Sequence, residues 1–396
     1  MVTLHLKAYD ISIGEMGPPL RALVAGGNYS KIAVLVDANT RRHCLPHFLQ
    51  NIDFEVVPIE ILAGELYKGL DTCHHIWLEM MRHGLDRRSM LINLGGGVIG
   101  DMGGFCAATY LRGIDFVQMP TTLLSQVDAS VGGKLAIDFN GVKNSIGVFQ
   151  NPKAVLVDPT FLKTLPLTEI RSGFAEVFKH ALIADAKQWQ DLQQITDLMA
   201  VDWAKFLAPS LSIKKRIVEE DPTEQGIRKT LNFGHTVGHA VESYSIADWG
   251  FRISDLPLPP KGGLIARSAE PSSTGDWSSD DLNSEGSPLG VRGKSALIHG
   301  DAVALGIICE AWISHKMLGL SAAELDEIVA FVKRFYPHWP LAVEDFPAVF
   351  DIMKKDKKNV GGRINFTLLP AIGEARIDQF CEVGVIEEAL RFYMGC

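Results

Sequence analysis

A glycine-rich turn between an apolar run and a helical stretch limits the folds open to this chain most strongly. Residues 89–94 have the pattern of a buried strand, residues 95–101 (GGGVIGD) satisfy G-x-G-x-x-G, and residues 102–111 have helical character. In this setting, glycines let backbone N–H groups approach a pyrophosphate, and the helix N-terminus adds a favourable potential. A tight turn without a ligand has the same pattern, so both interpretations stay open on these residues alone.

Short β-rich runs alternate with helical patterns through the first 160 or so residues, which indicates a parallel sheet with crossover helices. The predicted strands are residues 31–37, 53–59, 89–94, 115–119 and 154–157. From about Phe161 apolar residues recur at helical spacing, and the predicted helices are residues 173–183, 203–219, 302–317 and 325–335. We therefore expect an α/β nucleotide-binding domain over residues 1–160 and a mostly α-helical domain over residues 161–396, with a ligand site in the cleft between them.

Residues from about 246 to 293 interrupt the helical pattern. They are rich in Pro, Gly, Ser and Asp and show no amphipathic period, which is typical of a long loop or a disordered insertion. Over the whole chain, the composition is that of an ordinary globular protein, with 47% hydrophobic and 21% charged residues.

The bulk properties also exclude several classes of protein. No run approaches the roughly 20 apolar residues of a membrane span, and the first residues lack the pattern of an export signal. The six scattered cysteines form no CxxC pair, which suits reduced thiols in a cytoplasm. A net charge of −9 argues against nucleic acid as a partner.

Histidines supply the candidate metal ligands. His235 and His239 are four residues apart, so both imidazoles lie on one helical face, although one of them can equally serve in hydrogen bonding or proton transfer. The HExxH glutamate is absent, which excludes the metalloprotease motif. His299 is a third candidate, and Glu176 shares a helical face with Lys179, as a surface ion pair would also do. A glutamate with two or three histidines suits Zn²⁺ or Co²⁺.

Candidate anion ligands lie beside glycines. Lys134, Lys143 and Asn144 have the pattern of ligands on loops that pass close to a substrate, although exposed lysines are usually solvated. The acid expected about 20 residues after a Rossmann glycine motif is missing. Asp37 instead ends an earlier predicted strand, where it could bind an adenosine ribose or simply be solvated. This arrangement indicates a nucleotide fold other than the standard Rossmann layout.

The order of the motifs along the chain carries more information than any one of them. The segments GGGVIGD, ATYLRG, PTTLLSQVDASVGGK, GVKNSIG, GFAEVFKH, LNFGHTVGHAVE, HGDAVALG and DKK occur in this order. Together they closely resemble the 3-dehydroquinate synthase family of sugar phosphate cyclases. The resemblance covers nearly the whole chain except the predicted insertion.

The resemblance implies a set of site residues, a divalent metal (Zn or Co) and NAD. The implied metal ligands are Glu176, His235 and His299. The implied cofactor-binding residues are Asp37, Glu65, Lys68, Gly95, Gly96, Gly97, Asp101, Thr121, Thr122 and, with less support, Lys143. The implied substrate-binding residues are Arg112, Asp128, Lys134, Asn144, Lys214, Arg228, Asn232, His239 and Lys357. Of these, the catalytic candidates are His239, Lys134, Asn232, Arg228 and Lys214, together with Lys179.

The family's reaction gives these residues their expected roles. Members convert 3-deoxy-D-arabino-heptulosonate 7-phosphate into 3-dehydroquinate and phosphate in the shikimate pathway, which supplies aromatic amino acids. Transient NAD-dependent oxidation, phosphate elimination, re-reduction and aldol closure follow one another, so NAD is regenerated. We expect His239 to be a proton shuttle beside the metal. Arg112 matches an arginine that reaches the neighbouring subunit's site, which implies a homodimer.

The predicted insertion separates two parts of the implied metal site, since His239 and His299 are 60 residues apart. Loop closure costs only about 0.6 kcal/mol per doubling of length, so we predict that residues 294–306 dock as they would without it. The alternatives are a related cyclase with another substrate, a polyol dehydrogenase of similar fold, and a silent homologue that the insertion disables. Retention of Lys214, Arg228 and Asn232 favours the shikimate substrate.

Overall fold

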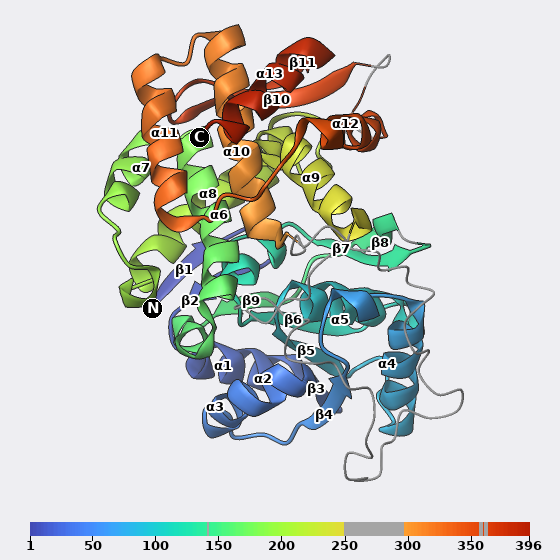
Figure 1. Cartoon of the computed structure of the whole chain (residues 1–396). Helices are drawn as coiled ribbons and strands as arrows, with labels where there is room; N and C mark the ends of the chain where they lie inside the picture. Colours follow the sequence, from blue (N-terminus) through green and yellow to red (C-terminus); the bar gives the residue numbers. More distant parts are fainter. Residues whose placement is uncertain (141, 249–296, 356–358, 360–362) are drawn as a thin grey trace, which may run out of the picture. The chain divides into compact units, whose positions relative to one another are not determined.

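A computed structural model describes residues 1–140, 142–248, 297–355, 359 and 363–396 (Figure 1). The chain divides into two compact units. The first comprises Met1–Leu231 with Ile372–Ala375, and the second comprises Asn232–Ala371 with Arg376–Cys396. The insertion predicted at residues 246–293 falls almost wholly outside the described residues.

A seven-stranded sheet forms the centre of the first unit. Its spatial order is β1-β2-β9-β6-β5-β3-β4, and every neighbouring pair is parallel except β1 and β2. The strands are β1 (Val2–His5), β2 (Asp10–Ile13), β3 (Ile32–Asp37), β4 (Val57–Ile61), β5 (Met90–Gly95), β6 (Asp115–Pro120) and β9 (Ala154–Val157). The five predicted strands are therefore all present, although β4 begins four residues later than the sequence pattern suggested.

The strand order creates a topological switch point. The chain adds β4 on one side of β3, and then β5, β6 and β9 on the other side. This is the doubly wound order 2-1-3-4-5, in which ligands bind outside the carboxyl ends of the strands where the order reverses. The carboxyl ends of β3 and β5 are therefore the place in this unit where a nucleotide would bind.

Helices cover both faces of the sheet. In β3, Ala33 and Leu35 face one core while Val34 and Val36 face the other, as successive strand residues must. Burial on both faces explains why these strands are continuously apolar rather than alternating. The helices of this part are α1 (Gly17–Gly27), α2 (Ala38–His43), α3 (Leu45–Gln50), α4 (Leu70–Arg82) and α5 (Gly97–Thr109), with short 3-10 helices η1 (Glu65–Tyr67) and η2 (Tyr110–Arg112).

A hairpin of β7 (Lys134–Phe139) and β8 (Val142–Phe149) replaces the loops that the sequence pattern suggested around Lys134 and Asn144. Leu135 and Ile137 on β7 are buried against α5, which fixes the strand by its apolar face. The two candidate anion ligands are therefore held by strand backbone rather than by free loops.

The first unit continues into helical structure after β9. Its elements are η4 (Pro159–Thr164), α6 (Leu167–Ala184), α7 (Ala186–Gln193), η5 (Leu198–Ala200), α8 (Ala204–Glu220) and η6 (Ile227–Asn232), whereas the π-helix η3 (Ser125–Ala129) lies earlier in the chain, between β6 and β7. The predicted helices at residues 173–183 and 203–219 correspond to α6 and α8. Every side chain from Ile170 to Ile183 of α6 is buried, so this helix lies inside the unit.

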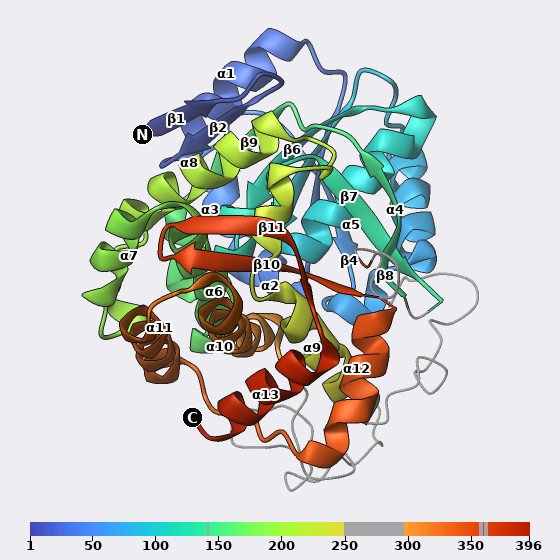
Figure 2. The same ribbon diagram turned by 90° about the horizontal axis from the view of Figure 1, so that it is seen from above.

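The second unit is built around one long buried helix, α10 (His299–Leu318). It contacts α9 (His235–Asp248), α11 (Ala322–Phe335), α13 (Val383–Met394) and β10 (Ile364–Ala371) (Figure 2). The remaining elements are η9 (Val343–Asp345), α12 (Phe346–Lys354) and β11 (Glu374–Cys381), which pairs with β10. The fold class is thus an N-terminal α/β sheet domain followed by a largely helical C-terminal domain, as the sequence predicts.

Two bulk expectations can be compared with the structure. All six cysteines are free, and five of them are buried. Within the described ranges, none of the helices is both long and apolar enough to span a bilayer.

Candidate active site

The glycine turn lies at the switch point of the first unit. Gly95 ends β5, and Gly96 is the N-cap of α5. Glycine has no side chain that could accept a hydrogen bond from the first N–H groups of the helix. A Cβ on Gly96 would come within 3.1 Å of the Thr122 side chain, and one on Gly97 within 3.4 Å of Ala129. The turn therefore exposes backbone donors in a place where side chains have little room, which fits a pyrophosphate.

Two further predicted cofactor residues follow neighbouring strand ends. Asp37 ends β3 and caps α2, where its Oδ1 accepts from the Thr40 N–H at 2.8 Å and from Thr40 Oγ1 at 3.0 Å. Thr121 follows β6, and its N–H donates to Gly95 O at 3.0 Å. Since β3, β5 and β6 are adjacent and parallel, these residues share one edge of the sheet.

A buried lysine joins several predicted ligands. Lys68 Nζ lies 2.7 Å from Asp101 Oδ2, 2.7 Å from Asn144 Oδ1 and 3.8 Å from Glu65 Oε1. Burial raises the pKa of Asp101 to about 6, although Lys68 opposes the shift. Burial by itself would lower the pKa of the Lys68 ammonium. The carboxylates of Asp101 and Glu65 outweigh this effect, so the pKa of Lys68 is raised. Asn144, predicted for the substrate, thus contacts the predicted cofactor residues.

A second buried network surrounds Asp128 on η3. Lys214 Nζ lies 2.6 Å from Asp128 Oδ1 and also donates to the main-chain oxygen of Asp128. His180 Nε2 lies 3.8 Å from the same carboxylate oxygen, and His180 Nδ1 lies 2.7 Å from Ser210 Oγ. Burial acts to raise the pKa of Asp128, but Lys214, His180 and Lys179 outweigh it and hold this pKa well below its usual range. Burial lowers the pKa of Lys214 despite its partner.

Glu176 and Lys179 form an ion pair on α6, and each side chain is only 1% exposed. The interpretation of this pair as a surface feature is therefore excluded. Two buried charges carry a desolvation cost that a surface pair would avoid. Asp128, Glu176 and His180 also present ligand atoms within 4.8 Å of one another.

The loop before β7 is held from two sides. The Gly132 N–H donates to Tyr9 Oη at 3.1 Å, and Gly132 O accepts from both terminal nitrogens of Arg228 at 3.3 Å. Arg228 is 3% exposed and also donates to Pro222 O at 2.6 Å. The predicted substrate arginine is therefore fixed by backbone oxygens next to the loop that leads to Lys134.

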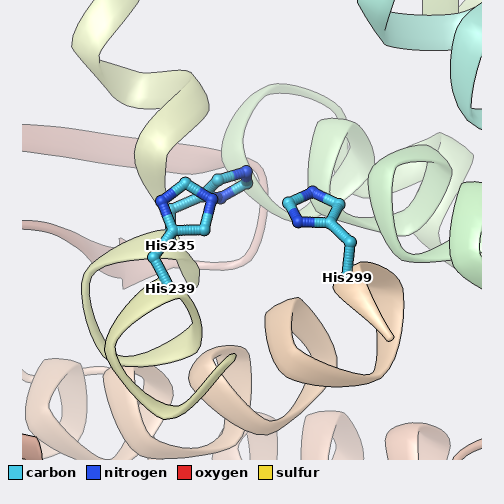
Figure 3. A group of neighbouring side chains, drawn as sticks. All are labelled: His235, His239 and His299. Atoms are coloured by element: carbon cyan, nitrogen blue, oxygen red, sulfur yellow. The ribbon is translucent and has the colours of Figure 1, made fainter. Parts of the chain in front are cut away.

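Three histidines gather in the second unit (Figure 3). Their ring centroids are 4.8 Å apart for His235 and His239, 5.8 Å for His235 and His299, and 5.5 Å for His239 and His299. One nitrogen of each ring lies within 4.8 Å of one nitrogen of the other two. Since Zn–N bonds are about 2.0–2.1 Å long, nitrogens on one ion lie at most about 4.2 Å apart, so the cluster is close to the size of a metal site.

Glycines bring these histidines together. α9 begins at His235 and α10 begins at His299, and the two helices pack against each other. A Cβ on Gly306 would overlap Gly234 O and come within 2.7 Å of Gly238 N, so no other residue allows this approach. The sequence signal for the contact is the repeated Gly-His step in GHTVGH, which supplies ligands and close packing together.

A buried glutamate on α10 reinforces the contact. Glu310 is 0% exposed, and its carboxylate accepts from the N–H of Gly234 at 2.6 Å and from that of Val237 at 3.1 Å. These donors belong to the beginning of α9, whose first N–H groups have no partner within the helix. Glu310 therefore fixes the first turn of α9, which carries His235.

Oxygen atoms lie within hydrogen-bonding distance of Nδ1 in His235 and in His299. His235 Nδ1 lies 3.2 Å from Phe233 O, and His299 Nδ1 lies 3.2 Å from Glu242 Oε2. Sequence reasoning missed Glu242, Glu310, His180, Ser210 and Tyr9. The sequence signal for these residues is weak. Glu242 lies three residues beyond His239 and His180 lies four residues beyond Glu176, and nothing else distinguishes them from other polar residues in helices.

The remaining predicted site residues are placed as follows. Glu176 belongs to the first unit and the histidines to the second, so the complete metal set of Glu176, His235 and His299 stays a prediction. Asn232 begins the second unit, Lys143 lies on β8, Arg112 ends η2 with a φ of 70°, and Lys357 lies outside the described residues.

Comparison with known families agrees with this geometry. The family described as 3-dehydroquinate synthase N-terminal matches residues 58–172. The family described as 3-dehydroquinate synthase C-terminal matches residues 173–250 and 290–359. The C-terminal match omits residues 251–289, which lie within the stretch that the sequence marks as an insertion.

Individual relatives give the same result. A curated 3-dehydroquinate synthase of Parabacteroides distasonis is 38% identical over 383 residues, which cover 96% of each chain. Among solved structures, 2-deoxy-scyllo-inosose synthase, complexed with carbaglucose-6-phosphate, NAD⁺ and Co²⁺, has a TM-score of 0.75 at 19% identity and covers 99% of both chains. The 2-epi-5-epi-valiolone synthase of Streptomyces hygroscopicus, with NAD⁺ and Zn²⁺ bound, has a TM-score of 0.75 at 22% identity, over 100% of this chain and 99% of its own.

The two structural likenesses establish the fold, and the sequence matches establish the family. The chain is an enzyme that belongs to the 3-dehydroquinate synthase family.

Proposed function

We propose that this chain converts 3-deoxy-D-arabino-heptulosonate 7-phosphate into 3-dehydroquinate and phosphate, with NAD and one divalent metal ion (Zn²⁺ or Co²⁺). The observation that carries the proposal is the cluster of His235, His239 and His299, which has the donor type and size of a metal site. The binding of NAD⁺ with Co²⁺ or Zn²⁺ by the two similar solved structures supports the same cofactors here.

The first unit offers a matching nucleotide site. The uncapped N-terminus of α5 at Gly96 would bind the pyrophosphate, and Asp37 at the end of β3 would bind the adenosine ribose. The Lys68 network with Asp101 and Glu65 would hold the cofactor's other polar groups. When bound, NAD exchanges a hydride with the substrate, and the metal acts as a Lewis acid toward its hydroxyl groups.

The chain's own residues supply binding and proton transfer. Charge-assisted hydrogen bonds from Lys134, Lys214, Arg228 and Lys357 would hold the carboxylate and phosphate of the substrate. We assign Glu176 as the third metal ligand together with His235 and His299. We assign His239 as the proton shuttle, because a neutral imidazole next to the reacting hydroxyl can accept and return a proton near neutral pH.

The geometry of the second unit argues against a homologue that the insertion disables. Gly306 packs on Gly234 and Gly238, and His299 reaches the histidines of α9, although about fifty residues separate the two helices. This supports the prediction that the segment after the insertion docks as it would without it. We also propose a homodimer in which Arg112 reaches the neighbouring site, and a cytoplasmic location, which six free cysteines suit.

The test is phosphate release from the sugar phosphate by the purified full chain with NAD⁺ and Zn²⁺ or Co²⁺, before and after chelation. Turnover to dehydroquinate that is lost on chelation and regained with metal, without net NADH, is the expected result. A dehydrogenase would accumulate NADH instead. No turnover by metal-replete protein would refute the proposed substrate, and a variant lacking residues 251–289 would then show whether the insertion is the cause.

A further inference from the structure

Glu242 stands out among the polar residues around the histidines because no step of the proposed reaction uses it. It lies on α9, three residues beyond His239, and its side chain is 9% exposed. Its Oε2 contacts Nδ1 of His299 at 3.2 Å, across the α9–α10 contact. The carboxylate therefore reaches a candidate metal ligand that lies on the other helix and beyond the predicted insertion.

This contact determines which nitrogen of His299 can bind a metal. An ionised carboxylate only accepts hydrogen bonds, so Nδ1 must carry the proton. Nε2 of the neutral imidazole is then the nitrogen with a lone pair. Phe233 O acts in the same way on Nδ1 of His235 at 3.2 Å. In both rings Nε2 is thus the atom left to bind a metal, and the contact with Glu242 also fixes the orientation of the His299 ring.

The returning chain makes a second contact with α9 one turn beyond Glu242. Ser245 Oγ donates to Glu242 O at 2.8 Å and accepts from the Leu297 N–H at 3.1 Å. Leu297 is the first described residue after the gap, and both it and Ser245 are buried. Two successive contacts, Ser245 with Leu297 and Glu242 with His299, therefore hold the returning chain on α9.

We propose that Glu242 is a positioning residue that orients His299 and selects its Nε2 as the metal ligand. The proposal rests on the proposed function in that it needs a metal at the histidine cluster. Glu242 makes no bond to the ion in this scheme. It restores the position of His299 after the insertion, and it should therefore govern metal affinity more than folding.

The experiment measures the Zn²⁺ affinity of the full chain by competition with a chromophoric chelator, and the visible absorption of the Co²⁺-loaded protein. The variants are Glu242→Leu, which removes the acceptor at similar size, and Glu242→Gln, which keeps a neutral acceptor. Tyr244→Phe is the matched control, since it removes a buried hydrogen bond from the same helix to Asp345 at 2.6 Å, away from the histidines.

We expect Glu242→Leu to weaken Zn²⁺ binding about 10- to 100-fold, with an altered Co²⁺ spectrum, and Glu242→Gln to recover part of the loss. Tyr244→Phe should lower the thermal midpoint of the chelated protein without changing Zn²⁺ affinity. Wild-type affinity in Glu242→Leu, or an equal loss in Tyr244→Phe, would overturn the proposal. Turnover of the sugar phosphate by wild type is scored separately. If Glu242→Leu binds Zn²⁺ as wild type does and wild type shows metal-dependent turnover, only the role of Glu242 is refuted. If Glu242→Leu loses Zn²⁺ affinity and wild type shows no turnover, only the proposed reaction is refuted.

Discussion

Replacing Gly306 by alanine should disrupt the histidine cluster through backbone packing alone. A Cβ at this position would lie 2.7 Å from Gly238 N and 2.9 Å from Gly234 C, whereas ordinary contacts of this kind begin near 3.4 Å. Relief of the contact with Gly238 N alone requires a separation of 3.4 − 2.7 = 0.7 Å between α9 and α10, and the overlap with Gly234 O, the nearest atom, requires more. The atoms involved are backbone, so no side-chain rotation can relieve the overlap.

The shift exceeds what a metal site tolerates. Metal–ligand distances hold to within about 0.2 Å, and the candidate ligands His235 and His299 lie on the two helices that would separate. Overpacking costs about 1–3 kcal/mol, while alanine gains about 1 kcal/mol over glycine in a helix, so the net loss is about 0–2 kcal/mol. We therefore expect a small fall in the thermal midpoint but a loss of Zn²⁺ affinity of at least about tenfold.

Gly384 provides the control, because it lies on α13 in the same unit and has no atom within 4 Å of an added Cβ. Gly384→Ala should bind Zn²⁺ as wild type does and be equally or more stable. Zn²⁺ affinity by chelator competition and thermal unfolding of chelated protein measure both variants. Wild-type Zn²⁺ affinity in Gly306→Ala would show that the close approach of α9 and α10 does not set the metal geometry.

Three further predictions concern the two networks of the first unit and the metal. Lys68→Met should weaken NAD⁺ binding, measured by calorimetry, because it leaves Asp101 buried without its cation and removes a contact to Asn144; unchanged affinity would exclude this network from the cofactor site. Asp128→Asn should destabilise the protein most at neutral pH. The pKa of Asp128 is lower in the folded than in the unfolded protein, so its carboxylate stabilises the fold at pH values above the unfolded pKa, and this stabilisation is lost as the pH falls toward the folded pKa. A difference in thermal midpoint between wild type and Asp128→Asn that does not shrink between pH 7 and pH 3 would contradict this. Adding Zn²⁺ at 1,000 times its dissociation constant should stabilise the chelated chain by about 4 kcal/mol, and a His235→Ala variant should respond much less in the same thermal titration.

The sequence predicted the nucleotide-binding edge of the sheet well because its signals are local. Strand, glycine turn and helix follow one another between Met90 and Thr109, and each is visible in the composition of about ten residues. The parallel order then places Asp37 and Thr121 at the same edge without further information. Signals of this kind depend on spacing along the chain, which a sequence displays directly.

The hairpin of β7 and β8 has a sequence signal that the prediction of loops did not use. Asn140 and Gly141 lie between two short runs, in the first of which Leu135, Ile137 and Phe139 stand at every second position, and Asn-Gly is a strong hairpin signal. Asn140 has a φ of 50°, as such a turn requires. The glycines and lysines around these runs instead favoured the interpretation as ligand loops, and that expectation concealed the strands.

Glu242 and Glu310 could not be predicted because their partners are set only by the contact between α9 and α10. On the helical pattern, neither acid has a spacing signal toward His299 or toward the first turn of α9. In the folded unit, Glu310 on α10 accepts from the N–H groups of Gly234 and Val237 on either side of His235, and Glu242 on α9 contacts the ring of His299. The candidate metal site therefore has two parts of different origin: candidate ligands that a motif reveals, and buried carboxylates that packing brings to them. An insertion between the helices leaves both parts intact as long as it does not disturb the glycine contact at Gly306. Loop length can then vary at small entropic cost while the ligand geometry stays fixed.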